Sequence, residues 1–196
     1  NILLDTAQSP ILQWAAYPEF FSPRAKEWPS RRKHLGFLQT CEARDDRTTP
    51  ALDAFLRSGE PPVVFTLGTS AVHKADGFLE TTYEVLSRRP TRSVLVCGSH
   101  AEAMRKRFAG LDHVHVEHYV SYSALFEKAR ALVHQGGIGT VAEALRAGRP
   151  SFVVPFGQDQ YDNAVHIEKL KAGFWLGNES LTSERLARSL DRLTSE

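Results

Sequence analysis

From residue 61 onward, the chain alternates short apolar runs with longer segments of helical periodicity. Apolar runs such as VVFTLG (63–68) are typical of strands buried on both faces, and the segments between them repeat apolar positions at helical spacing. The pattern predicts strands at 63–68, 93–98, 113–120, 131–134 and 151–155, with a short one in FWLG at 174–177. It predicts helices at 76–89, 101–110, 123–130, 140–148, 163–173 and 183–193. This alternation predicts an α/β fold with a doubly wound, Rossmann-like parallel sheet.

Residues 1 to about 48 carry no clean period. Much of this part is rich in proline and aromatic residues, which favours an extended segment that wraps over another surface. The stretch TTPALDAFLRSG predicts one helix, because Thr49 can cap it, Pro50 suits its first turn and Gly59 can end it. We therefore expect a lead-in or interlobe wrap segment with a first helix over residues 1–60, and a Rossmann-like domain over 61–196.

Composition narrows the function only by exclusion. The net charge of +1 gives no field to recruit nucleic acid or anionic membranes, and no apolar run is long enough to cross a bilayer. Two cysteines, Cys41 and Cys97, make no disulfide framework and favour a reduced, cytoplasmic protein. The chain starts at Asn1 rather than methionine, so we expect it to be cut from a longer polypeptide.

The densest chemical signal is the stretch HQGGIGT, which joins the strand at 131–134 to the next helix. Gly136, Gly137 and Gly139 allow a tight turn and a close approach of the backbone to a ligand. The loop leads into a helix N-terminus, where several N–H groups lack partners and the dipole is positive. A diphosphate suits this environment, and His134 at the strand tip could donate a further hydrogen bond to it.

Two other interpretations of the same stretch stay open. Thr140 and Glu143 match a capping box, T-x-x-E, in which case the glycines only make a tight turn. The letters GIGTVA (137–142) also match the dinucleotide pattern G-x-G-x-x-A, with Asp159 about 20 residues on as a ribose-binding acid. That match is to a degenerate pattern and comes late in the series of strands.

The longer stretch HQGGIGTVAEALRAGRPSFVVPFGQDQYDNA resembles the donor-binding signature of the inverting family-1 glycosyltransferases of the GT-B fold. That signature reads approximately H-x-G-G-x-G-T, E-A-L, G-x-P, V-x-P and D-Q-x-x-N-A, and all of its elements stand here in order. The resemblance spans nearly the whole chain and is strongest from 62 to 176. It implies the C-terminal lobe of a GT-B fold, which binds a nucleotide diphosphate sugar.

The resemblance also implies roles for individual residues. The implied diphosphate-binding residues are His134, Gly136, Gly137, Gly139 and Thr140, with Gly68, Thr69 and Ser70 on the phosphate side of the pocket. Glu143 would bond the ribose, Tyr119 and Val120 would flank the base, and Asp159 and Gln160 would bond the sugar. Asp159 can also serve as the cap of the following helix.

Two positions fall outside the family's fixed pattern. Ser121 stands where the family has proline, which bears on the shape of the base loop. Gln135 fills a variable place in the family's pattern.

The sequence gives no sign of a metal site. It holds no D-x-D, and HVHVEH offers only His113 and His115 on one strand face, with no third ligand at a convincing spacing. We expect the positive helix end to neutralise a departing diphosphate in place of a cation, and we expect no cofactor beyond the substrate, a UDP- or dTDP-sugar.

The resemblance implies transfer of the sugar to an acceptor hydroxyl with inversion, by a histidine base in an N-terminal acceptor-binding lobe. No such lobe precedes residue 60, so we expect no catalytic residue in this chain, and no transfer by it alone. The missing lobe would be a partner in cis or a separate subunit. The alternative is a stand-alone nucleotide- or NAD-binding Rossmann module without transferase activity.

Overall fold

The computed structural model describes residue 9 and residues 11–38, 48–68 and 76–195. The chain divides into two compact units, Asn1–Glu42 and Ala43–Glu196. The larger unit holds the Rossmann-like sheet and the candidate site, and the smaller holds two short strands.

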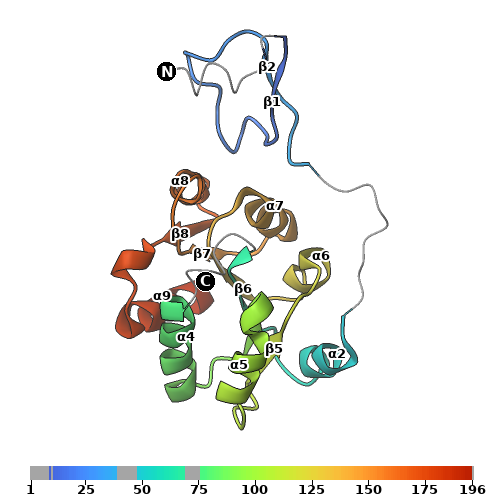
Figure 1. Ribbon diagram of the computed structural model, residues 1–196, viewed down its shortest axis with the longest axis vertical. Coiled ribbons are helices and arrows are strands. Elements are labelled where there is room, and N and C mark those ends of the chain that lie inside the picture. The colour runs from blue at the N-terminus through green and yellow to red at the C-terminus, as the bar shows by residue number, and fades with distance from the viewer. Residues whose placement is uncertain (1–8, 10, 39–47, 69–75, 196) are drawn as a thin grey trace. The chain divides into compact units, whose positions relative to one another are not determined.

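The larger unit is built on a six-stranded sheet in which all strands are parallel (Figure 1). Its strands are β3 (Val63–Thr66), β4 (Ser93–Val96), β5 (Val114–Glu117), β6 (Ala131–His134), β7 (Ser151–Val153) and β8 (Gly173–Trp175). They are ordered β5-β4-β3-β6-β7-β8 across the sheet, which is the strand order of a doubly wound nucleotide-binding fold. The predicted α/β class and parallel sheet are confirmed. Strand β6 has its predicted bounds, and β3, β4, β5 and β7 are shorter than predicted.

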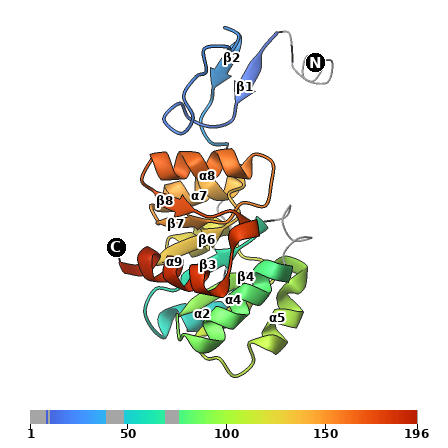
Figure 2. The same cartoon turned by 90° about the vertical axis from the view of Figure 1, so that its left-hand side faces the viewer.

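Helices connect successive strands and cover both faces of the sheet (Figure 2). They are α2 (Pro50–Arg57), α4 (Asp76–Arg88), α5 (Ala101–Arg107), α6 (Tyr122–Phe126), α7 (Ile138–Ala147), α8 (Gln160–Lys169) and α9 (Ser183–Ser195), with 3-10 turns η2 (Gly98–His100) and η3 (Asn178–Ser180). Helices α4 and α9 pack side by side over one face, and α6 and α7 pack together over the other. No helix among the described residues is long and apolar enough to cross a membrane.

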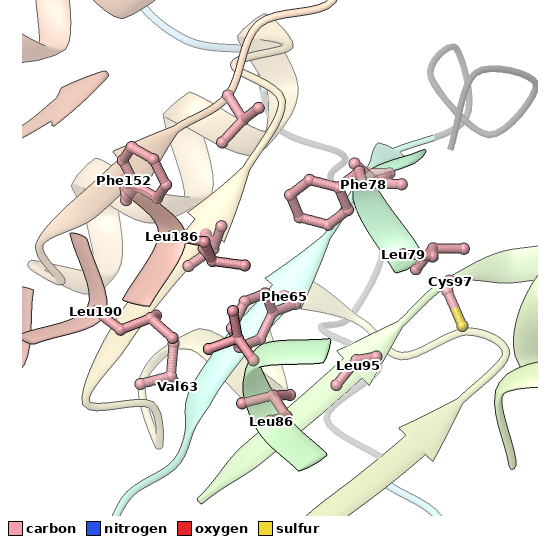
Figure 3. Packing of buried hydrophobic residues seen from close by; sticks show 14 of the residues in the cluster. Val63, Phe65, Phe78, Leu79, Leu86, Leu95, Cys97, Phe152, Leu186 and Leu190 are labelled. Carbon is pink, nitrogen blue, oxygen red and sulfur yellow. The ribbon is translucent and has the colours of Figure 1, made fainter. Parts of the chain in front are cut away.

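The core under α4 and α9 is formed by alternate residues of the central strands. Val63 and Phe65 of β3 meet Phe78 of α4 and Leu186 of α9, and all four side chains are buried (Figure 3). Burying one such side chain stabilises the fold by about 1.5–3 kcal/mol. This packing holds the strand ends in fixed register.

The opposite face has a second core that includes α2. Val64 and Leu132 of the sheet pack with the fully buried Leu52 of α2. The predicted cap is confirmed, since the hydroxyl of Thr49 accepts a 3.1 Å hydrogen bond from the Leu52 N–H. Thr49 also donates to the carboxylate of Glu117, at 2.5 Å, which ties the start of the helix to the end of β5.

The smaller unit is held by a parallel pair of short strands and an aromatic cluster. Strands β1 (Gln13–Ala15) and β2 (Arg32–His34) pair in register. Trp28 packs against Tyr17 and against His34, with ring centroids 6.4 Å and 5.2 Å apart. The guanidinium of Arg32 lies 4.6 Å from the centre of the Trp28 ring.

The buried position of Leu52 predicts that α2 contributes directly to the stability of the sheet. We expect Leu52→Ala to lower the free energy of unfolding by about 2–5 kcal/mol, because it leaves a cavity in the second core. We expect Arg57→Ala, at an exposed position of the same helix, to change it by less than about 0.5 kcal/mol. Urea denaturation of the two variants measures this, and equal midpoints would contradict the packing.

Candidate functional site

The order of the strands places the switch point of the sheet, where the ligand crevice of a doubly wound fold is expected, between the carboxyl ends of β3 and β6. Here the connections diverge, since β3 leads outward through β4 and β6 leads outward through β7. Ligands of doubly wound sheets bind at this switch point. The loop after β3 begins with Leu67 and Gly68, and the predicted diphosphate residues Thr69 and Ser70 lie outside the described residues. The loop after β6 is the glycine loop.

Helix α7 begins at Ile138, directly after the glycine loop, and Gly137 occupies its N-cap position without a side-chain cap. The capping-box interpretation of Thr140 and Glu143 is therefore wrong, because Thr140 lies inside the first helical turn. The first hydrogen bond of the helix runs from the Val141 N–H to the Gly137 carbonyl. The amides of Ile138, Gly139 and Thr140 consequently have no acceptor within the helix and point toward its positive end.

His134 ends β6 as a fully buried side chain with one nitrogen unpaired. Its Nδ1 accepts a 3.1 Å hydrogen bond from the N–H of Gly136, so the proton of the neutral ring lies on Nε2. Nε2 has no partner among the described residues. Burial lowers the pKa of the imidazole to about 4, so it is a neutral donor at pH 7. A buried N–H without a partner at the base of the crevice suits an anionic ligand.

Gly136 makes the sharp turn that aims the loop. Its φ of +88° favours glycine. A Cβ at this position would lie 2.8 Å from a methyl of Val153 and 3.1 Å from the carbonyl oxygen of Gln160. The turn therefore packs directly against β7 and the first residue of α8.

The side chain of Thr140 faces inward, toward α6. Burial raises the pKa of Tyr122, and hydrogen bonds from Thr66 and Thr140 oppose that rise. The Tyr122 hydroxyl lies 2.7 Å from the Thr66 hydroxyl, and its ring stacks on Phe126. The side chain of Thr140 is buried beside Tyr122, and its backbone amide is at the open end of α7.

The predicted sugar-binding residues meet the glycine loop through Asn163 of α8. The side-chain amide of Asn163 donates to the carbonyl of Gly136 at 2.9 Å and to the carboxylate of Asp159 at 3.0 Å. Asp159 is exposed and occupies the N-cap position of α8, as the alternative interpretation predicted, but its side chain makes no capping hydrogen bond. Gln160 is buried, and its side-chain Oε1 accepts a hydrogen bond from the backbone N–H of Phe156 at 2.8 Å.

The predicted ribose and base residues lie on α7 and after β5. Glu143 is on the second turn of α7 and pairs with Arg146 of the same helix. Tyr119 and Val120 follow the end of β5, where Tyr119 is 74% exposed and Val120 is buried in the second core with Leu132 of β6 and Ala144 of α7. The structure therefore connects the glycine loop with Asp159 and Gln160, and it packs Val120 in the core beside α7.

Ser121 keeps the backbone that the family's proline would have. Its φ of −61° is the angle to which a proline ring is fixed, and its hydroxyl contacts Ser123 at 2.8 Å. The departure from the family pattern at this position therefore does not change the local backbone of the base loop.

Two of the three histidines of HVHVEH make hydrogen bonds within the protein. His113 contacts the Leu86 carbonyl through Nε2 at 2.9 Å, and His115 contacts the Glu117 carboxylate at 2.9 Å. Across residues 9, 11–38, 48–68 and 76–195, no three His, Cys, Asp or Glu side chains gather in a way that could hold a metal ion.

Sequence reasoning missed three residues that the fold brings to the site: Tyr122, Gln135 and Asn163. Asn163 is part of D-Q-x-x-N-A, so the motif itself could have indicated it. Tyr122 and Gln135 had no such signal, because their positions depend on the packing of α6 on α7 and of β3 beside β6.

The buried neutral state of His134 predicts a loss of stability in acid. The unfolded chain takes up a proton near pH 6.5 and the folded protein only near pH 4, so stability is present above pH 6.5 and falls as the pH drops toward 4. Between pH 7.5 and pH 5, the wild type should lose about 2 kcal/mol more than His134→Gln, which has no titrating group. Urea unfolding at the two pH values measures this, and parallel losses would show that His134 is not buried as described.

Comparison with known proteins finds glycosyltransferases. Residues 63–196 match the model of the glycosyltransferase family 28 C-terminal domain. An uncharacterised glycosyltransferase of Mycobacterium tuberculosis is 31% identical over 170 residues, which is 87% of this chain and 40% of the relative. The O-mycaminosyltylonolide 6-deoxyallosyltransferase of Streptomyces fradiae is 34% identical over 153 residues, which is 76% of this chain and 33% of the relative. The chain thus spans well under half the length of these relatives.

A solved structure shows the same fold. The crystal structure of the glycosyltransferase of kitacinnamycin superimposes with a TM-score of 0.75 at 26% identity, over 95% of this chain and 47% of that one. The resemblance to the donor-binding lobe of GT-B glycosyltransferases is confirmed. The chain belongs to the glycosyltransferase family 28 C-terminal domains, as a family-1-like C-terminal domain of the GT-B fold.

Proposed function

We propose that this chain is the donor-binding half of an inverting, metal-independent glycosyltransferase. It would hold a UDP- or dTDP-sugar for transfer to an acceptor hydroxyl supplied at another lobe or subunit. One observation carries the proposal: within the described residues, the neutral Nε2–H of His134, which has no hydrogen-bond partner, and the N-terminus of α7 both lie at the switch point of the sheet.

The charge of the ligand follows from the groups that face the crevice. Three helix amides and one imidazole N–H are all donors, so they match a group that only accepts, such as a diphosphate. Each hydrogen bond to a charged oxygen contributes about 1.5–3 kcal/mol, so four together give about 6–12 kcal/mol. Association costs about 4–15 kcal/mol, so contacts to the base and sugar are needed for useful affinity.

The same donors would favour the bond-breaking step. When the sugar leaves, negative charge grows on the diphosphate oxygen that had carried it. The amides of α7 and the His134 N–H are fixed before the reaction, so they stabilise that charge without reorganisation. A neutral His134 keeps its donor over the physiological pH range, and the positive helix end supplies charge where other enzymes use a cation.

The remaining predicted residues have groups left over for a donor. Asp159 is exposed and oriented by Asn163, so its carboxylate can accept from sugar hydroxyls. The side-chain Oε1 of Gln160 accepts a hydrogen bond from the Phe156 N–H, which leaves the side-chain NH₂ of Gln160 for the sugar. The exposed ring of Tyr119 would pack against the base, and the backbone of Val120 would contact the edge of the base. Glu143 would leave its ion pair with Arg146 and bind the ribose. The name of the Streptomyces relative denotes transfer of a 6-deoxyallosyl group, which supports a hexose on the donor.

The NAD-binding alternative makes a different demand on the fold. A dinucleotide fingerprint belongs to the first turn between a strand and a helix, whereas the glycine loop here follows β6, the fourth strand of the sheet in chain order. Calorimetric titration of the chain with UDP, dTDP and NAD separates the two. We expect saturable binding of UDP or dTDP, and binding of NAD alone would overturn the proposal.

Substitutions of two glycines in the loop should have opposite effects on stability, and together they test the site. Gly136→Ala should lower the free energy of unfolding by about 1–3 kcal/mol, because its positive φ and close neighbours leave no place for a methyl group. Gly139→Ala should leave stability unchanged or raise it by up to about 1 kcal/mol, because the position is helical and nothing described lies within 4 Å of an added Cβ.

That open space is where we place the diphosphate. Gly139→Ala should therefore weaken binding of the nucleotide diphosphate at least tenfold, which is about 1.4 kcal/mol, despite its intact fold. Calorimetry of the variant beside the wild type measures this. Unchanged affinity in a folded Gly139→Ala protein would place the diphosphate elsewhere.

A further inference from the structure

Gln135 lies in the crevice between the ends of β3 and β6, although it fills a variable place in the family pattern. Its side chain is 3% exposed. Its Nε2 lies so close to Gly68 that a Cβ there would overlap it, and a Cβ on Gly137 would lie only 2.9 Å from it. The carboxamide therefore fits between two glycines of the predicted diphosphate site because neither has a side chain.

The oxygen of the Gln135 carboxamide is buried without a hydrogen-bond partner among the described residues. The same is true of Nε2 of the neighbouring His134. A buried polar atom without a partner costs free energy, and an apolar side chain of the same length would fill the space without that cost. Two such atoms on adjacent residues at the switch point indicate a ligand that satisfies both.

The chemistry of the two ends of the carboxamide restricts that ligand. The NH₂ group can donate to a phosphate oxygen, but Oε1 can only accept. A diphosphate is itself only an acceptor, so it cannot satisfy Oε1. A hydroxyl group can. The ligand must therefore present a phosphate oxygen and a hydroxyl within the reach of one carboxamide, as at the junction of a diphosphate with a sugar.

We propose that Gln135 binds the donor at this junction. Its NH₂ donates to a diphosphate oxygen, and its Oε1 accepts from a hydroxyl of the sugar that is transferred. The assignment rests on the proposed function, and it adds that this position distinguishes a nucleotide sugar from the bare nucleoside diphosphate.

The test compares two substitutions of equal length by calorimetry. The probes are UDP and UDP-glucose, or dTDP and dTDP-glucose if the wild type prefers them. Gln135→Met removes both hydrogen-bonding groups. It should weaken binding of the nucleotide sugar at least tenfold, and it should weaken binding of the nucleoside diphosphate less. Gln135→Glu places a carboxylate beside the diphosphate and should weaken binding of both ligands at least tenfold. Thr82→Val is the matched control, because Thr82 is buried and its hydroxyl donates only to the Phe78 carbonyl of its own helix.

Thermal unfolding without ligand separates binding from a structural role. Gln135→Met should melt at the same temperature as the wild type or higher, because it removes an unsatisfied buried oxygen. A large drop in Tm with unchanged affinities would overturn the assignment, as would wild-type affinities in both variants. Equal weakening of both ligands by Gln135→Met would overturn the contact with the sugar. A wild type that binds neither ligand would instead overturn the proposed function, and this assignment with it.

Discussion

The site depends on one reversal of the backbone, at Gly136. There the chain leaves β6, turns through a positive φ between Val153 and the Gln160 carbonyl, and enters α7 two residues later. The same glycine donates its N–H to His134 and offers its carbonyl to Asn163. One residue without a side chain thus fixes the tautomer of the buried imidazole, the direction of the helix end and the attachment of α8.

Around this turn, the polar groups divide into those that the protein satisfies itself and those that it leaves open. The Tyr122 hydroxyl meets the Thr66 hydroxyl, the side-chain Oε1 of Gln160 accepts from the Phe156 N–H, and the side-chain amide of Asn163 donates to Gly136 and Asp159. These contacts hold the framework rigid. Nε2 of His134 and Oε1 of Gln135 are left without partners within the described part of the chain, at the point where the sheet topology predicts a ligand. A rigid framework with preset donors is what stabilisation of a departing anion requires.

The two units of the chain differ in size and content. The larger unit carries the whole Rossmann-like sheet and the donor residues, and the smaller unit is an aromatic cluster on two short strands. Relatives are more than twice as long as the part that this chain matches. A donor half that binds tightly and an acceptor half that supplies the base would let the two substrates be selected by separate surfaces.

The sequence by itself determined the α/β class, the positions of nearly all elements and the identity of the glycine loop. These follow from local causes: apolar runs that must be buried on both faces, a capping Thr49, and glycines that permit a tight turn. It also assembled the donor motif, since its residues lie within 30 positions of one another in the chain. Local patterns could not place the start of α7, because Gly137 serves as its N-cap through backbone geometry alone and T-x-x-E suggested a later start.

Only the tertiary structure decided which polar atoms are free. The inward turn of the Thr140 hydroxyl depends on Tyr122, which is 18 residues away, and the burial of Gln135 depends on Gly68 of another strand end. Such pairings arise from strand order and helix packing, which join segments distant in the chain. A pattern along the chain records which residue type stands at each position, but satisfaction of a hydrogen bond is a property of two positions in space.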